Sequence, residues 1–317
     1  MATVEKLTLA HFDDLYAAYL HEEDGSSKKE QWQRLFKQYH PDHDDGGRVL
    51  VDKGTIVGML GTLWSYREIN NAGFDFCNVH SWYVHDDYRA YSMRMIYPIL
   101  TAKGAVITGF TPSAHVIGMS VKSGFHFLDA RVRVLLPINS RVESTVQSKI
   151  MFDRDEILSH ATDHQRQIIN DHPAPDFGVC MIVDRERSCL MIYCTVTRHY
   201  LNYCYLLHVS DIALFAESAH WLRSHLTRAT GSSYVAVDER RCEGHAISKS
   251  LLIPLSSNHM TRGDLLKPSQ IDALYTEVAF LKLTTFPAIT YALNPMRKRY
   301  PRSLYAPQVK GGMRSYG

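Results

Sequence analysis

The apolar positions change their period along the first half of the chain. Over residues 8–21 and 28–40 they recur every three or four residues, which predicts two amphipathic helices. Residues 48–51, 56–69 and 74–84 are instead runs rich in valine, leucine and aromatic residues, separated by short polar turns. These runs predict an antiparallel meander of three strands.

After the meander, helical and strand patterns alternate. A helix expected at 88–103 is followed by a strand at 105–110, a second helix at 112–123 and a strand at 125–136. Gly124 stops the second helix, because glycine readily adopts the left-handed conformation that ends a helix. The first half therefore predicts a mixed, mostly antiparallel sheet flanked by helices.

The second half repeats this order, beginning with a helix expected at 153–171. The later elements are three strands, a helix, a strand and a helix, at 178–183, 189–197, 203–212, 214–230, 234–238 and near 244–252. A shift of 128 residues places 79–84 on 207–212 and 106–110 on 234–238. A tandem repeat explains this agreement, although any two α/β segments can be brought into partial register.

We therefore assign the chain to the α/β (α+β) class, with two tandem lobes that each contain a mixed, mostly antiparallel sheet flanked by helices. The first lobe is expected to span 1–140 and the second 141–285. A basic extension follows at 286–317, where arginine and lysine stand among prolines and glycines.

Composition describes an ordinary globular protein. Of the 317 residues, 45% are hydrophobic and 21% charged, and the net charge is +2. Such a small net charge does not indicate a protein that binds polyanions, so nucleic acid is not an expected partner. The sequence shows no signal peptide, no apolar run long enough to span a membrane and no metal-ligand spacing. Because the six cysteines lie mostly in apolar strand-like runs, we expect reduced thiols in a cytoplasmic protein.

A strand that ends at Val84 leads into a short loop and the start of a helix. The first N–H groups of a helix have no intrahelical partners and, with the helix dipole, bind anions such as a pyrophosphate. This stretch resembles the acyl-CoA signature of the GNAT acyltransferase superfamily, in which a strand ending in valine leads to a Tyr-Arg pair and an arginine-x-x-glycine-x-glycine loop. Val84, Tyr88 and Arg89 match that signature. Ser92 and Arg94 stand where the family usually has glycines.

The resemblance implies that the first lobe binds acetyl-CoA or another acyl-CoA as a substrate. The pyrophosphate would lie on the arginine loop. The pantetheine arm would lie along a second motif, a helix with an alanine near its start that ends in Lys-x-Gly-Phe. The expected acyl-CoA contacts are Val84, Arg89, Ala90, Tyr91, Ser92, Met93, Arg94, Ala114, Lys122 and Phe125.

The resemblance also implies acyl transfer by direct attack on the thioester. In the family a backbone N–H near the end of the strand binds the thioester carbonyl, and Val84 holds that position. Four residues earlier, at the family's usual base position, stands His80, whose imidazole suits proton transfer near neutral pH. A structural histidine is the alternative, since His208 occupies the matching place in the second half. Ser120 replaces the family's acid tyrosine, so the thiolate takes its proton from Ser120, a nearby tyrosine or water.

The second lobe lacks the acyl-CoA signature. Its corresponding turn has neither arginine nor glycine, and Glu217 would oppose a bound anion, so we expect no cofactor there. The resemblance implies an acyltransferase that moves an acetyl or longer acyl group from coenzyme A to an amine or hydroxyl acceptor. Two alternatives stay open, a tandem-lobe transferase that uses aminoacyl-tRNA and a non-catalytic acyl-CoA-binding module. The sequence also leaves open the acceptor and a homodimer.

Overall fold

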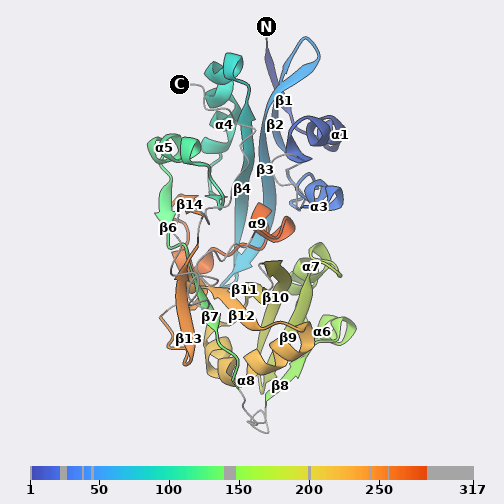
Figure 1. Cartoon of the computed structure of the whole chain (residues 1–317), viewed down its shortest axis with the longest axis vertical. Coiled ribbons are helices and arrows are strands. Elements are labelled where there is room, and N and C mark those ends of the chain that lie inside the picture. Colours follow the sequence, from blue (N-terminus) through green and yellow to red (C-terminus); the bar gives the residue numbers. More distant parts are fainter. Residues whose placement is uncertain are drawn as a thin grey trace, which may run out of the picture.

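A computed structural model describes residues 2–21, 27–37, 39–43, 46–138, 148–198, 201–242, 244–255 and 257–283. In these ranges the chain forms two lobes arranged end to end, each built on a seven-stranded mixed sheet (Figure 1). The expected fold class of two tandem α/β lobes is confirmed. The predicted basic extension at 286–317 lies outside the described residues.

The first sheet takes its strands mostly from the first half of the sequence. Its order is β1-β2-β3-β4-β5-β14-β6, and only the pair β4 and β5 is parallel among its neighbouring strands. The strands are β1 Thr3–Lys6, β2 Gly47–Asp52, β3 Thr55–Ile69, β4 Ala72–Val84, β5 Ala105–Gly109, β14 His259–Arg262 and β6 His126–Leu128. The predicted meander is therefore formed by β2, β3 and β4. Their long apolar runs place buried side chains on both faces of the sheet.

The second sheet repeats this plan with the order β8-β9-β10-β11-β12-β7-β13. Here the pair β11 and β12 is parallel, at the position of β4 and β5. The strands are β8 Ser148–Met151, β9 Gly178–Asp184, β10 Arg187–Arg198, β11 Leu201–Val209, β12 Tyr234–Asp238, β7 Arg131–Leu135 and β13 Ser250–Pro254.

The two sheets exchange one strand each. β7 comes from the first half but lies between β12 and β13 in the second sheet, while β14 lies between β5 and β6 in the first. His259, which opens β14, follows Arg131, which opens β7, by the same 128 residues that relate the two halves. The single strand expected at 125–136 is therefore wrong. It divides at Asp129, whose carboxylate accepts hydrogen bonds from Arg131 where the chain crosses to the other lobe.

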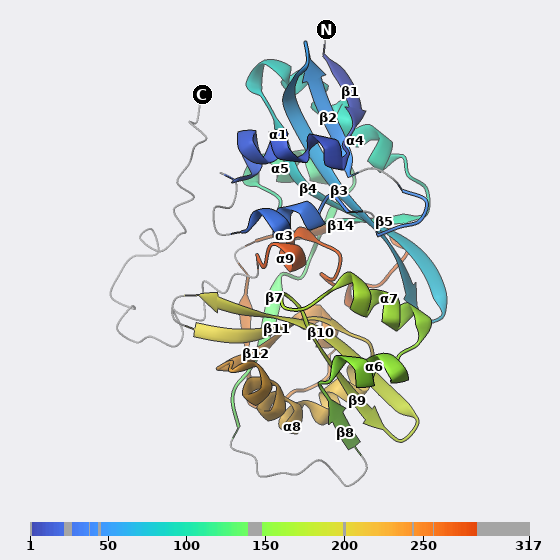
Figure 2. The same ribbon diagram turned by 90° about the vertical axis from the view of Figure 1, so that its right-hand side faces the viewer.

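Helices cover both faces of each sheet (Figure 2). In the first lobe these are η1 Leu9–His11, α1 Phe12–Leu15, η2 Tyr16–Leu20, α3 Lys29–Arg34, η3 Asp86–Tyr91, α4 Ser92–Leu100 and α5 Ala114–Lys122. The later elements are α6 Arg154–His160, α7 Asp163–Asp171, α8 Ile212–Thr230, η4 Glu239–Cys242, η5 Pro268–Gln270 and α9 Glu277–Phe280. Because α1 and α3 cover one face of the first sheet and α4 and α5 the other, the two faces offer different surroundings to a site in the sheet.

Two expected helices differ from the structure. The helix expected at 153–171 is two helices, because Ala161 takes an extended conformation and Thr162 caps a new helix through the N–H of Gln165. The helix expected near 244–252 is wrong. Gly244 and Lys249 have positive φ angles, which an α-helix does not accommodate, and β13 begins at Ser250.

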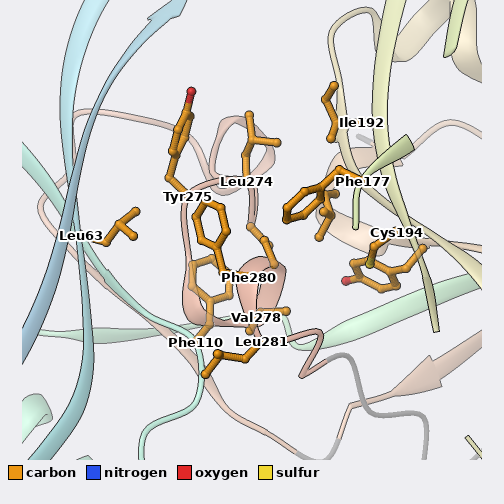
Figure 3. Packing of buried hydrophobic residues seen from close by; sticks show 14 of the residues in the cluster. Leu63, Phe110, Phe177, Ile192, Cys194, Leu274, Tyr275, Val278, Phe280 and Leu281 are labelled. Carbon is orange, nitrogen blue, oxygen red and sulfur yellow. The ribbon is translucent and has the colours of Figure 1, made fainter. Parts of the chain in front are cut away.

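One continuous apolar cluster joins the two lobes. It contains Leu63 of β3, Phe110 after β5, Phe280 of α9, and Phe177 and Ile192 from the second lobe. Figure 3 shows the residues of the α9 segment between side chains of the two lobes. The last described part of the chain therefore packs where the lobes meet.

A buried charge cluster crosses the same boundary. Arg67 of β3 donates two hydrogen bonds to Asp272, at 2.8 and 2.9 Å, and the His208 Nδ1 of β11 lies 2.7 Å from the same carboxylate. Burial alone would raise the pKa of Asp272, but the Arg67 guanidinium and His208 hold it well below its usual range. Asp272 thus binds one charged or polar partner in each lobe.

Candidate active site

The first sheet opens where β4 and β5 stop pairing. Their parallel register runs from Asp75 opposite Ala105 to Asn78 opposite Thr108, although β4 continues to Val84. Beyond Asn78 the two strands line opposite sides of a pocket. An opening inside a sheet exposes backbone groups that would otherwise pair, so it can accept an extended ligand that carries amide groups.

An irregularity in β4 shapes this opening. Met59 of β3 pairs with Tyr83, but two residues further along Gly61 pairs with His80, so β4 contains one extra residue. Ser81 lies in this bulge with φ of 45°, a conformation that non-glycine residues seldom adopt. Bulges of this kind re-aim neighbouring side chains and are frequent beside active sites.

The pocket contains about 630 Å³ of space not filled by protein atoms, part of it open to solvent. A Cβ added at Gly109 would meet only the Val79 carbonyl oxygen, at 3.7 Å, so the absence of a side chain there keeps the gap between the strands open. The pocket is lined by Val79, His80, Ser81, Trp82, Ile96, Gly109, Thr111, Pro112, Ser113, Val116, Ser120, Phe125 and Met260.

His80 lies at the inner end of this pocket and is only 4% exposed. Its ring covers Gly61, where an added Cβ would come within 2.2 Å of the imidazole. Nδ1 lies 3.2 Å from the Ser81 hydroxyl, and Nε2 is buried with no hydrogen-bond partner in the described part of the chain. Burial lowers the pKa of His80 to about 4, so the ring is neutral at pH 7 but a weaker base than the exposed imidazole that the sequence led us to expect.

More polar side chains lie on the same face of the sheet as His80. Asn78 Nδ2 donates to the Thr108 hydroxyl at 3.3 Å, and the Asn78 carbonyl oxygen has no partner among the described residues. Thr111, on the wall of the pocket, donates its hydroxyl to the Glu277 carboxylate at 2.7 Å. Glu277 belongs to α9, so a residue near the end of the described chain contacts a residue of the pocket wall.

The predicted pyrophosphate loop is a helical turn that continues into α4. Ser92 opens α4, and its N–H donates to the Arg89 carbonyl. The Arg89 side chain is largely exposed and pairs with Asp86 at 2.7 Å. Tyr88 donates its hydroxyl to Asp52 at 2.8 Å. The remaining members of the loop, Ala90, Tyr91, Met93 and Arg94, lie along the same helical stretch, where the Arg94 guanidinium stacks 5.0 Å from the Tyr91 ring.

Val84 ends β4 opposite Gly58 and packs into the apolar cluster beside α4. Val84 does not line the pocket described above, whereas His80, four residues earlier on β4, does.

The second predicted motif forms α5 and the turn after it. Ala114 opens the helix and Lys122 is its last residue, while Gly124 has φ of 87° in the turn that ends it. Ser120 and Phe125 are buried and line the pocket. The structure therefore brings His80, Ser120 and Phe125 to one pocket, whereas Ala114 and Lys122 lie at the two ends of α5.

At the corresponding place in the second sheet, a side chain bridges the two strands. Pairing of β11 with β12 ends at Leu206 and Val237, and the turn η4 follows β12 directly. Arg241 of η4 inserts its side chain and donates to the carbonyl of Val209, the last residue of β11. At the start of α8, the carboxylate of Asp211 already accepts the Leu214 N–H at 2.9 Å.

Several general features accompany these sites. All six cysteines are buried thiols, as the sequence predicts. In the described ranges no group of three or more histidine, cysteine, aspartate or glutamate residues is placed to hold a metal ion. Within the same ranges, no helix combines the length and the apolar character needed to cross a membrane.

No family model and no curated protein matches the sequence. Solved structures do match the fold. One is a GCN5-related N-acetyltransferase from Anabaena variabilis, with a TM-score of 0.54 and 10% identity over 83% of this chain and 72% of the other. Another is a GCN5-related N-acetyltransferase from Kribbella flavida, with a TM-score of 0.53 and 12% identity over 82% of this chain and 70% of the other. The chain therefore shares the fold of these N-acetyltransferases, in agreement with the expected GNAT-like lobes.

Sequence reasoning missed most of the residues that form this site, and three of them show why. Met260 comes from β14, the strand that the second half contributes to the first sheet, and Glu277 comes from α9. Gly109 belongs to the strand predicted at 105–110. Only the structure shows that its lack of a side chain leaves the opening between β4 and β5 free. The strand at 259–262 could have been predicted from the repeat, because it lies 128 residues after 131–134. No local sequence pattern distinguishes Glu277.

Proposed function

We propose that the protein transfers an acyl group from acyl-coenzyme A to an amine or hydroxyl acceptor, with the thioester bound in the gap between β4 and β5. The proposal rests mainly on this opening between β4 and β5. It is an opening between two strands, bordered by Gly109 and backbone of 79–82, with an apolar side under α4 and α5 and a neutral histidine at its inner end. A pantetheine arm is an extended chain with two amides, and such a chain fits an opening of this kind.

His80 is the proposed base. An attacking ammonium must lose a proton, and the neutral His80 ring offers an unpaired Nε2 on the face opposite the α4 and α5 side. The Ser81 hydroxyl can accept a proton from Nδ1 or donate one to it, and in the tautomer with the proton on Nδ1 the Nε2 lone pair is available. The acceptor would then approach from the face that α1 and α3 cover.

The remaining predicted contacts belong to the same proposal. The Val84 backbone would bind the thioester carbonyl, and the helical stretch from Arg89 to Arg94 would bind the pyrophosphate. Because Ser92 already donates its N–H to Arg89, that stretch has to offer its other N–H groups or side chains, or rearrange when the cofactor binds. Ser120, Phe125 and the α5 residues Ala114 and Lys122 would border the pantetheine arm.

The test uses the purified full chain with acetyl-, butyryl- and myristoyl-CoA. We expect at least one of them to raise the melting temperature, since a ligand that binds the native state stabilises it. Release of free coenzyme A thiol should accelerate when polyamines, aminoglycosides or peptide amines are added. Gly109→Leu is the matched control, because its side chain would fill the gap and abolish both effects.

Three outcomes separate the candidate functions. A thermal shift with thiol release supports the transferase. A thermal shift without thiol release for any acceptor, together with its loss in Gly109→Leu, identifies the non-catalytic acyl-CoA-binding module. No shift with any acyl-CoA contradicts the proposed function and leaves the aminoacyl-tRNA alternative to be tested with charged tRNA.

A further inference from the structure

Glu277 is a buried carboxylic acid that the sequence motifs do not involve. It is 3% exposed and opens α9, the helix that packs between the lobes. Its Oε1 accepts the Thr111 hydroxyl at 2.7 Å, while Oε2 is buried and makes no hydrogen bond of good geometry, although the Asn78 amide is near enough to lower the carboxyl pKa. A buried acid with an unsatisfied oxygen is costly, so a function at this place is a reasonable cause for it.

The surroundings of Glu277 favour the protonated form of its carboxyl group. Burial raises the pKa of the carboxyl group. The groups that oppose this rise are uncharged: the Thr111 hydroxyl, the Asn78 amide and the backbone of Glu277 and Phe110.

Charged groups on the neighbouring elements are already paired. On α3, which packs against α9, Arg34 binds Asp176 at 2.8 Å, and Lys282 just after α9 binds the same carboxylate at 3.1 Å. Neither cation pairs with Glu277, so neither offsets the rise in its pKa.

Thr111 connects this acid to the pocket. It lines the same pocket as His80, and its hydroxyl contacts the Glu277 carboxyl group at 2.7 Å. None of the residues that line the pocket is acidic. A hydroxyl alone is a weak proton donor, whereas a hydroxyl backed by a carboxylic acid can give up its proton and regain one at once.

We propose that Glu277 and Thr111 form a proton relay that protonates the leaving thiolate, in place of the tyrosine that Ser120 replaces. The inference rests on the proposed acyl transfer. As the tetrahedral intermediate collapses, the carbon–sulfur bond breaks and its electron pair goes to sulfur. For this step the Thr111 hydroxyl turns its proton from Glu277 to the sulfur, and the protonated Oε1 of Glu277 donates to Thr111 Oγ1 across the same 2.7 Å contact. Thr111 then gives its proton to sulfur and takes the carboxyl proton of Glu277, which becomes a carboxylate. After coenzyme A leaves, water in the pocket returns a proton to Glu277 through Thr111.

Four variants of the full chain test the relay: Glu277→Gln, Thr111→Val, Thr111→Ser and the double variant Glu277→Gln with Thr111→Val. Glutamine keeps the hydrogen bond to Thr111 but supplies no carboxyl proton. We expect Glu277→Gln and Thr111→Val each to lower kcat for thiol release roughly 100-fold, with KM for the acyl-CoA within a few-fold. The double variant should lose no more than either single variant, and Thr111→Ser should retain most of the activity.

The pH profile separates a relay from a packing role. A general acid acts in its protonated form, so wild-type kcat should fall as the pH rises through the pKa of Glu277, and Glu277→Gln should lack that decline. Melting temperatures show whether each variant folds, and Thr111→Ser and Glu277→Gln serve if Thr111→Val does not. If the wild type releases thiol and Glu277→Gln matches it in kcat and pH profile, the relay is wrong while the transferase stands. If the wild type releases no thiol from any acyl-CoA, the proposed function fails and the relay fails with it.

Discussion

The parallel strand pair of the first sheet and that of the second occupy the same place in the fold but differ in how their polar groups are used. At the end of the β4 and β5 pairing lies a pocket, and His80 Nε2, the Asn78 carbonyl and Glu277 Oε2 make no hydrogen bond of good geometry to the described residues. At the end of the β11 and β12 pairing, Arg241 bridges the strands and His208 binds Asp272. Arg241 Nε is itself buried without a partner among the described residues. The open pocket, and not unsatisfied polar atoms alone, therefore distinguishes the first place from the second.

The two histidines show what this difference means energetically. His80 and His208 lie 128 residues apart in the repeat, and both are buried. Burial lowers the pKa of each, but only for His208 does a carboxylate, Asp272, oppose the shift. A histidine with a free Nε2 can exchange a proton with a ligand, whereas one that is hydrogen-bonded to a buried ion pair contributes to stability.

Exchanging each histidine for glutamine should separate the two roles most strongly. We expect His80→Gln to lower the turnover of thiol release by roughly 100-fold or more, because general base catalysis contributes about 10²–10⁴-fold. Its affinity for acyl-CoA should stay nearly constant. His208→Gln should leave turnover per folded molecule unchanged and lower the melting temperature. Equal turnover in His80→Gln and wild type would assign His80 to packing.

Removing the carboxylate between the lobes should have the largest effect on stability. Asp272→Ala leaves the Arg67 guanidinium buried without a counter-charge and His208 without its acceptor. Breaking a buried pair in this way costs about 3–5 kcal/mol, to be measured by denaturant unfolding. A loss no larger than that of an exposed ion pair would show that the cluster does not hold the lobes together.

Two buried histidines of the first lobe predict a pH dependence. Burial lowers the pKa of His80 and of His259 to about 4, so between pH 6.5 and 4 the unfolded chain binds protons that the folded chain does not. The free energy of unfolding should therefore fall as the pH drops through this window, by up to about 3 kcal/mol for each histidine. Unfolding of the double variant His80→Gln with His259→Gln should show a flatter dependence. An unchanged slope would mean that other groups cause it.

The smallest effect is expected for a change of Glu217, near the start of α8. Glu217 is exposed and pairs with Arg187 at 2.6 Å, and exposed pairs contribute little. Glu217→Lys should barely change the melting temperature, and it should leave coenzyme A binding as it is in the wild type. A new or stronger binding event in this variant would show that the second lobe retains a cofactor site that Glu217 suppresses.

The sequence predicted most of the strands because their apolar runs are long and bounded by turns. It did not predict the strand exchange, since β7 and β14 are short and nothing in 125–136 shows that the chain leaves one sheet for the other at Asp129. In the site, His80, Ser120 and Phe125 follow from motif spacing. Glu277 could not be found in this way, because its contact with Thr111 depends on how the end of the chain packs between the lobes.

Calorimetric titration with the acyl-CoA that gives the strongest thermal shift tests most directly the claim that the first lobe binds the thioester in its opened sheet and the second lobe does not. The account predicts one binding site per chain, which Gly109→Leu abolishes and Glu217→Lys leaves unchanged. Two sites per chain, or a single site that persists in Gly109→Leu, would contradict it.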